Sequence, residues 1–268
     1  MEELDVFTEA NAYEQFMGRW SRLIAPVFIE FARIPDLGRV LDVGCGTGAL
    51  AFTIASLRPR CNVIGIDASR EYIRSAESQN PSSATVHVKV GNAQSLEFPD
   101  STFDCSVSLF ALNFIPDALK GVYEMVRVTR PGGRAAAAVW DYGGSMEMLR
   151  IFWDAAAALD AGAEKFDEKM MPLCRAGELS GLFRSVGLHD VHEQSLEAEL
   201  KFKSFPDYWE PFLLGQGPAG AYVKYIGADR ASVLRQKVKS QLGLKDETIP
   251  FALRGRLWAV RGTISESK

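Results

Sequence analysis

The stretch "VLDVGCGTGAL" (Val40 to Leu50) decides the fold class, because it joins a short apolar strand to a helix through a glycine-rich loop. It fits two nucleotide-binding patterns. Beginning at Gly44 it satisfies the dinucleotide pattern G-x-G-x-x-G/A, and the acidic Asp67 follows roughly 20 residues later, as that pattern requires. With Asp42 in front and Gly48 included, it is instead D-x-G-x-G-x-G. The glycines alone do not separate the two patterns.

On both sides of this loop, apolar strands alternate with helical segments. The predicted strands are "RVLDVG", "NVIGIDAS", "ATVHVKVGNA", "FDCSVSLFAL" and "GGRAAAAVWD". Strands separated by helices indicate βαβ units, and therefore a parallel sheet with helices on both faces. Residues 10–33, before the first strand, have helical spacing that puts the following side chains roughly on one side: Tyr13, Phe16, Trp20, Leu23, Ile24, Val27 and Phe31.

After residue 141 the pattern changes to a helical stretch, an alternating strand ("VHEQSLEAELKF"), an aromatic-rich segment and a last strand. The aromatic-rich segment is too long for a hairpin connection, so we expect it to cap the carboxyl edge of the sheet. We expect one domain over residues 1–268, whose parts are an N-terminal helical lid (1–36), a cofactor-binding core (37–141), a helical insertion (142–175), a cap insertion (204–247) and a final strand (249–264).

Composition excludes several classes of protein. The chain has 268 residues, of which 47% are hydrophobic and 24% charged, which is typical of a globular protein. Its net charge is −4 and its Lys and Arg residues are scattered, so we expect no nucleic-acid partner. The four cysteines are not closely paired, which favours a reduced, cytoplasmic protein without a metal. The N-terminus lacks the order of a signal peptide, and the apolar run "LIAPVFIEFA" is too short to span a membrane. We expect a soluble protein.

Asp42 indicates which of the two cofactor classes fits the glycine loop. A carboxylate at this position would repel a pyrophosphate, whereas it could orient the ammonium group of a cofactor that carries an amino acid. S-adenosylmethionine has such an ammonium group, together with a sulfonium, a ribose and an adenine, and it has no phosphate. Asp67 can accept hydrogen bonds from both ribose hydroxyls of either cofactor, so it does not decide between them.

The loop, "GIDAS", "GNAQSLEFPDSTFD", "FDCSVSLFALNFIPD" and "VTRPGGRAAAAVWD" occur in an order and spacing that resemble class I S-adenosylmethionine-dependent methyltransferases, most closely the small-molecule and quinone-biosynthesis branch. The resemblance covers about residues 10–205. It implies a Rossmann-like α/β fold with a seven-stranded, mostly parallel sheet whose last strand is antiparallel. The cofactor-binding candidates that it implies are Tyr13, Trp20, Asp42, Gly44, Cys45, Gly46, Gly48, Asp67, Ala68, Asn92, Ala93, Leu109 and Phe110.

Several of these residues have a second interpretation. Asn92 is either an adenine contact or only a turn residue, and Tyr13 and Trp20 are also explained by helix packing. Asp67 could cap the following helix beside Ser69 as well as bind a ribose.

The acceptor side offers no clear catalytic base. A histidine that often follows the fourth strand in related enzymes is replaced here by "ALNFIP". Asn113 can position a substrate but cannot accept a proton at neutral pH, and Asp141 also reads as a turn residue before two glycines. These two are the weak catalytic candidates, and the substrate-binding candidates are Asn113, Trp140, Trp209 and Tyr222.

We therefore predict methyl transfer from S-adenosyl-L-methionine to a small, partly apolar acceptor, with S-adenosyl-L-homocysteine as product. The reaction is an in-line displacement that proximity and desolvation drive. Two alternatives stay open: a protein that binds the cofactor without turnover, and a nicotinamide-dependent reductase. The methylated atom (O, N, C or S) and the acceptor are undecided, and a homodimer is a further expectation.

Overall fold

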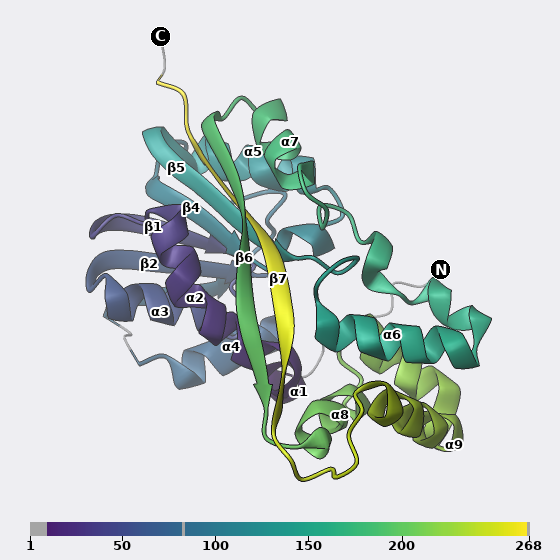
Figure 1. Cartoon of the computed structure of the whole chain (residues 1–268). Coiled ribbons are helices and arrows are strands. Elements are labelled where there is room, and N and C mark those ends of the chain that lie inside the picture. Colours follow the sequence, from purple (N-terminus) through teal and green to yellow (C-terminus); the bar gives the residue numbers. More distant parts are fainter. Residues whose placement is uncertain (1–9, 82–83, 267–268) are drawn as a thin grey trace. The chain divides into compact units, whose positions relative to one another are not determined.

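The described residues, 10–81 and 84–266 of this computed structural model, form one seven-stranded mixed sheet, which confirms the predicted fold class (Figure 1). Residues 1–9 of the predicted N-terminal lid lie outside the described residues. The strand order is β3-β2-β1-β4-β5-β7-β6. The strands are β1 (Leu37–Val43), β2 (Arg60–Asp67), β3 (Val86–Val90), β4 (Phe103–Leu109), β5 (Thr129–Trp140), β6 (His189–Phe202) and β7 (Phe251–Thr263).

The topology places a switch point between β1 and β4. The chain runs outward from β1 through β2 to β3, and then returns so that β4 pairs in parallel with the other side of β1. β5 continues in parallel beside β4, whereas β7 pairs antiparallel with β5. Ligands of open α/β sheets bind outside the carboxyl ends of the strands at such a switch point, so the fold directs attention to the loops after β1 and β4.

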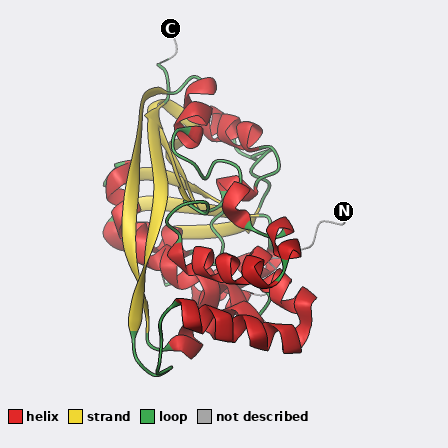
Figure 2. Cartoon of the chain, turned by 45° about the vertical axis from the view of Figure 1, so that its right-hand side comes forward, coloured by secondary structure: helices red, strands yellow, loops and turns green. Residues whose placement is uncertain are grey.

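Helices flank the sheet on both faces (Figure 2). β4 and the second half of β5 are buried almost throughout, as expected of central parallel strands covered on both sides. The α-helices are α1 (Ala10–Tyr13), α2 (Arg19–Ala32), α3 (Ala49–Leu57), α4 (Arg70–Gln79), α5 (Ala118–Val128), α6 (Glu147–Leu159), α7 (Glu178–Ser185), α8 (Phe205–Leu213) and α9 (Gly217–Gln241).

The chain divides into two compact units. The sheet unit comprises residues 18–140, 172–196 and 257–268, and the helical unit comprises residues 1–17, 141–171 and 197–256. The two last strands, β6 and β7, have residues in both units. Within the helical unit, Phe16 packs edge-on against Phe212 of α8, with 5.1 Å between the ring centroids.

The predicted buried face of the N-terminal helix is wrong at two positions. Leu23 and Val27 are exposed by 46% and 48%, while Trp20, Ile24 and Phe28 are buried. The reason is a π-helical turn (Glu14–Gly18) between α1 and α2, which changes the phase of the helix. An unbroken α-helical period drawn through residues 10–33 therefore assigns the wrong face to α2.

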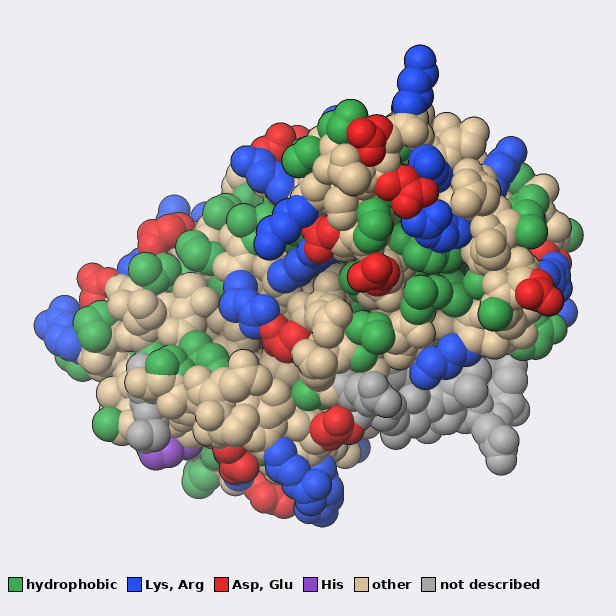
Figure 3. Space-filling model, turned by 90° about the horizontal axis from the view of Figure 1, so that it is seen from below, with side chains coloured by type: hydrophobic (Ala, Val, Ile, Leu, Met, Phe, Trp, Pro, Cys, Tyr) green, Lys and Arg blue, Asp and Glu red, His purple; other side chains and the backbone are tan. Residues whose placement is uncertain are grey.

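The surface carries both signs of charge. On the face drawn in Figure 3, Lys and Arg side chains lie interspersed with Asp and Glu and with small apolar patches. Of the helices in the described part of the chain, none is both long and apolar enough to cross a membrane.

Candidate cofactor site

The glycine loop between β1 and α3 is fixed by the end of β2. The backbone N–H groups of Gly44 and Cys45 both donate to the carbonyl of Ile66, at 2.8 and 2.9 Å. Gly44 has a φ of +75°, and a Cβ atom there would lie 2.2 Å from the Cβ of Ala111, which follows β4. Only glycine fits this position, and the loops after β1 and β4 are therefore in direct contact.

Asp67, at the end of β2, is held in place by backbone donors. Its Oδ2 accepts from the N–H of Gly46 at 2.9 Å, and its Oδ1 accepts from the N–H of Ser69 at 2.8 Å. Burial raises the pKa of Asp67, and these backbone hydrogen bonds oppose the rise. The hydroxyl of Ser69, which accepts from the N–H of Tyr72, caps α4. Each carboxylate oxygen of Asp67 has a further lone pair, so the group can still bind a pair of hydroxyls.

Asp42 is the most unusual residue of the site. Its side chain is fully buried near the end of β1, and among the described residues neither carboxylate oxygen accepts a hydrogen bond of ordinary geometry. Burial, and next the nearby carboxylate of Asp67, raise the pKa of Asp42 to about 8, while the backbone N–H of Ala51 in the first turn of α3 opposes the rise. A buried carboxyl without a partner is costly, so this position calls for a ligand that supplies a donor or a positive charge.

The loop after β3 contains Asn92 and Ala93. The side-chain Oδ1 of Asn92 accepts from the N–H of Gln94 at 2.9 Å, and the Asn92 side chain is exposed. The turn role predicted for Asn92 is therefore present. This oxygen has a second lone pair, and the amide N–H₂ group can also donate, so Asn92 could still bind adenine. That role stays a prediction.

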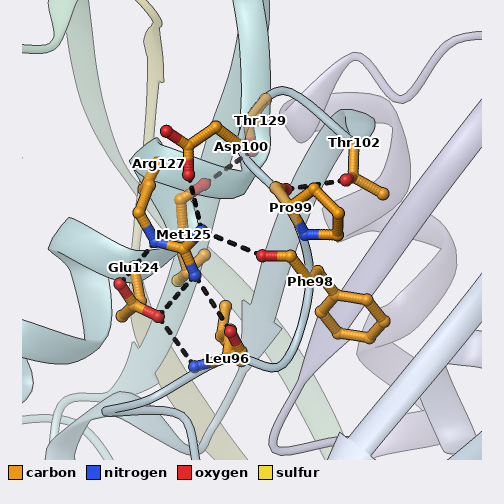
Figure 4. Close-up of polar contacts among 9 residues, drawn as sticks. All are labelled: Leu96, Phe98, Pro99, Asp100, Thr102, Glu124, Met125, Arg127 and Thr129. Carbon is orange, nitrogen blue, oxygen red and sulfur yellow. Dashed lines mark hydrogen bonds and ion pairs between the residues drawn. The ribbon is translucent and has the colours of Figure 1, made fainter.

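Arg127, near the end of α5, fixes the rest of this loop (Figure 4). Its guanidinium donates to the carbonyls of Leu96 and Phe98, both at 2.9 Å, and to the carboxylates of Asp100 and Glu124, both at 2.7 Å. Glu124 in turn accepts from the N–H of Leu96. Arg127 thus anchors to α5 the loop that was predicted to contact adenine. Its five donors are directed at backbone and carboxylate oxygens.

The end of β4 forms an aromatic pair with the end of β5. Phe110 follows Leu109 with a φ of +62°, an uncommon conformation for a bulky residue, and its N–H donates to the carbonyl of Ala138 at 2.8 Å. Its ring stacks on Trp140, with centroids 4.3 Å apart and planes within 11°. Trp140 is fully buried, and its indole N–H has no partner among the described residues.

Two further polar side chains near this edge are buried without partners in the described part of the chain. Both amide atoms of Asn113, on the 3-10 helix η2 (Leu112–Phe114), lack a hydrogen bond, although its side chain is only 4% exposed. The hydroxyl of Ser108 on β4 is likewise buried and unpartnered. Sequence reasoning missed Ser108; the available signal was a serine near the carboxyl end of a strand that was predicted to be buried.

Asp141, the other catalytic candidate, is already paired. Its Oδ2 accepts from Nε and Nη2 of Arg256 at 2.8 and 2.6 Å and from the N–H of Ser145 at 3.0 Å. These contacts close the turn that carries Gly143 and Gly144, which agrees with the turn role predicted for Asp141. A carboxylate used in this way is poorly suited to accept a proton from a substrate.

The predicted site residues fall into the two units. Those in the sheet unit are Trp20, Asp42, Gly44, Cys45, Gly46, Gly48, Asp67, Ala68, Asn92, Ala93, Leu109, Phe110, Asn113 and Trp140. Those in the helical unit are Tyr13, Asp141, Trp209 and Tyr222. Trp20 is buried under the guanidinium of Arg19, and Trp209 and Tyr222 are buried in an aromatic cluster with Phe152. Within the described ranges, no three His, Cys, Asp or Glu side chains are grouped to hold a metal.

Comparisons with known proteins point to one family. Residues 40–133 match the family model of a methyltransferase domain. A demethylmenaquinone methyltransferase of Bacillus licheniformis is 36% identical over 107 residues, which is 40% of this chain and 46% of that protein. The chain thus spans about half the length of the curated relatives that it matches.

Solved structures share the fold. The YcgJ protein of Bacillus subtilis has a TM-score of 0.60 at 19% identity, over 93% of this chain and 100% of that one. The phosphoethanolamine N-methyltransferase 2 of Haemonchus contortus, in complex with S-adenosyl-L-methionine, has a TM-score of 0.60 at 18% identity, over 96% of this chain and 57% of that one.

Proposed function

We propose that this chain, whose residues 40–133 carry a methyltransferase domain, transfers a methyl group from S-adenosyl-L-methionine to a small, partly apolar acceptor. The family match supports the reaction. The name of the Bacillus licheniformis relative supports a quinone-type ring as the acceptor class. A reductase that uses a nicotinamide dinucleotide is disfavoured, because a pyrophosphate supplies neither the hydrogen-bond donor nor the positive charge that the buried carboxyl of Asp42 lacks.

The observation that carries the proposal is the unpartnered, fully buried carboxyl of Asp42 beside Asp67. The ammonium group of S-adenosylmethionine supplies the positive donor that Asp42 lacks, and the ribose supplies the two hydroxyls that the free lone pairs of Asp67 can accept. The loop from Gly44 to Gly48 brings backbone close to the ligand, and a side chain at Gly44 would collide with Ala111. The residues present therefore fit this cofactor.

When bound, the cofactor supplies a methyl group on a sulfonium, which is a good leaving group for in-line displacement. The chain has to bind, orient and desolvate the reactants, and this can lower the barrier by about 7–11 kcal/mol without a dedicated base. Asp42 would hold the ammonium group of the cofactor, and Asp67 would hold its ribose. Asn113 and Ser108 offer unpartnered polar atoms that can orient an acceptor hydroxyl, and the stacked pair of Phe110 and Trp140 supplies an apolar surface.

Ligand-induced thermal stabilisation tests the cofactor part of the proposal. We expect S-adenosylhomocysteine to raise the melting temperature and NADH to leave it unchanged, because only a ligand of the folded state stabilises it. Asp67→Ala should remove most of the shift. Asp104→Ala is the matched control, since Asp104 lies at the opposite end of β4 and binds Arg130 and the N–H of Arg39. A shift with NADH and none with S-adenosylhomocysteine would overturn the proposal.

Release of S-adenosylhomocysteine over a panel of acceptors tests the acceptor class. The panel contains reduced naphthoquinones, simple catechols, small amines and thiols, each with and without an apolar substituent. We expect turnover with the hydroxylated rings. Turnover confined to the amines or thiols would retain methyl transfer and refute the quinone-type acceptor.

A further inference from the structure

Among the described residues, the groups that shift the pKa of Asp42 include no positively charged side chain. Asp42 is flanked by Gly65 of β2 and Val107 of β4 in the sheet register, and the first turn of α3 contributes the backbone N–H of Ala51. The ionisable groups that interact with it are both acidic: the carboxyl of Asp67 and the thiol of Cys45.

Two effects disfavour the negatively charged form of Asp42. Full burial removes the water that would solvate a carboxylate, and the Asp67 carboxylate adds repulsion from a second negative charge. The cost is smaller for Asp67, because Gly46 and Ser69 donate backbone N–H groups that oppose the effect of burial. Of two neighbouring acids, Asp42 is therefore the one that keeps a proton.

We propose that the ligand-free chain holds a proton on Asp42 and that binding of the cofactor expels this proton, because the α-ammonium group of the ligand takes its place as the positive partner. The inference rests on the proposed function, since it assumes that S-adenosylmethionine is the ligand. One proton leaves to solvent for each cofactor bound, and the carboxylate that forms is neutralised by the ammonium. The raised pKa of Asp42, about 8, agrees with this exchange at neutral pH.

Two consequences follow for binding. The affinity for any ligand with the ammonium should increase with pH, by up to about tenfold per pH unit while Asp42 is still protonated in the free chain. A ligand that has the adenine and ribose but no amino-acid part should bind without this pH dependence. 5′-Methylthioadenosine is such a ligand.

Calorimetry of the full chain measures the exchange directly. Titrations with S-adenosylhomocysteine at pH 7 in two buffers of different ionisation enthalpy, phosphate and Tris, give the number of protons released per ligand. We expect close to one proton for S-adenosylhomocysteine and close to none for 5′-methylthioadenosine. Equal proton release for the two ligands, or none for either, overturns the inference while leaving the proposed function intact. If neither ligand binds, the proposed function itself fails.

Two variants assign the proton. Asp42→Asn should abolish the difference between the ligands while still binding 5′-methylthioadenosine, which shows that the ribose and adenine site is folded. Glu168→Gln is the matched control, because Glu168 is the other buried carboxyl with a strongly raised pKa and belongs to the helical unit. It should leave the proton count unchanged. Loss of proton release in Glu168→Gln, with release retained in Asp42→Asn, would assign the proton elsewhere and refute the inference.

Discussion

One aspartate lies near the carboxyl end of β1 and another directly follows β5. Both are buried, but they differ in their hydrogen-bond partners. Asp42 is fully buried and has no partner in the described part of the chain, whereas Asp141 is 5% exposed and accepts hydrogen bonds from Arg256 and from the N–H of Ser145. A carboxylate whose partners belong to the chain contributes to folding. A buried carboxylate without a partner lowers the stability of the folded chain until a ligand supplies a donor or a positive charge. From this difference we expect Asp42 to serve ligand binding and Asp141 to serve the structure.

The largest pH effect that this comparison predicts concerns Glu168, a third buried carboxyl, whose partner is the neutral indole N–H of Trp153. Burial raises the pKa of Glu168 from 4.5 to about 7. The folded chain then binds this proton more tightly than the unfolded chain, so the free energy of unfolding falls as pH rises from about 4.5 to about 7. A pKa difference of this size corresponds to about 3 kcal/mol.

Urea unfolding of the wild type and Glu168→Gln across pH 4 to 8 measures this effect. Glutamine keeps an acceptor for the indole but does not ionise. Between pH 4 and 8 the free energy of unfolding of the variant should therefore fall by about 3 kcal/mol less than that of the wild type. Glu97→Gln, at an exposed position, serves as the control and should follow the wild type. Parallel curves for Glu168→Gln and the wild type would show that the indole partner already compensates the carboxylate.

Asp42→Asn should separate ligand affinity from stability. At pH 8, where the carboxylate of the wild type forms readily, loss of a charge-assisted contact to the ammonium should weaken S-adenosylhomocysteine binding by about a hundredfold. The ligand-free variant should be at least as stable as the wild type, because a buried group that ionises has been removed. Calorimetry gives the first quantity and urea unfolding the second. A variant that unfolds more easily and binds normally would reverse the assignment of Asp42.

Asp141→Asn should show the opposite result. The change weakens the contact with Arg256, so we expect a loss of about 1–2 kcal/mol in the free energy of unfolding. Turnover should fall by about tenfold or less, which is below the usual contribution of a general base. Steady-state kinetics at a temperature well below the melting point checks this. A thousandfold loss of turnover with an unchanged melting temperature would make Asp141 the base.

These residues also show how far the sequence could predict the site. The D-x-G-x-G-x-G pattern was enough to place Asp42 and the glycines, because the strand, loop and helix are contiguous in the chain. The partner of Asp141 could not be found in this way, since Arg256 lies on β7, 115 residues later. Local spacing also gave no sign of the left-handed backbone at Phe110 or of the π-helical turn, because tertiary contacts select such conformations.

Asn113→Ala extends the comparison to an uncharged group. Both amide atoms of Asn113 lack partners in the described structure, so their removal should not lower the melting temperature by more than the loss of packing requires. For a hydroxylated acceptor we expect turnover to fall by about tenfold or less, in line with a positioning contact. Turnover measured with and without the acceptor hydroxyl separates a hydrogen bond from packing. An equal loss with both acceptors would refute the positioning role.

The smallest effect is expected at Tyr225, which tests whether the aromatic cluster of the helical unit has an acceptor-binding part. Residues 204–225 contain six aromatic rings, of which Tyr225 is 70% exposed. The other five are buried, namely Phe205, Tyr208, Trp209, Phe212 and Tyr222. Trp209→Ala should therefore cost about 3–5 kcal/mol of stability, as truncation of a buried ring does. Tyr225→Ala should leave the melting temperature within about 1 °C of the wild type, since an exposed substitution changes stability by less than about 0.5 kcal/mol.

The acceptor KM of Tyr225→Ala shows whether the cluster only packs or also contacts the acceptor. If the rings serve only packing, the KM stays at the wild-type value. We expect a rise of about two- to threefold for acceptors with an apolar substituent, because an exposed ring that contacts such a substituent contributes less than about 1 kcal/mol. Cofactor affinity, measured by calorimetry, should not change. An unchanged KM in a stable variant would leave the cluster with a purely structural role.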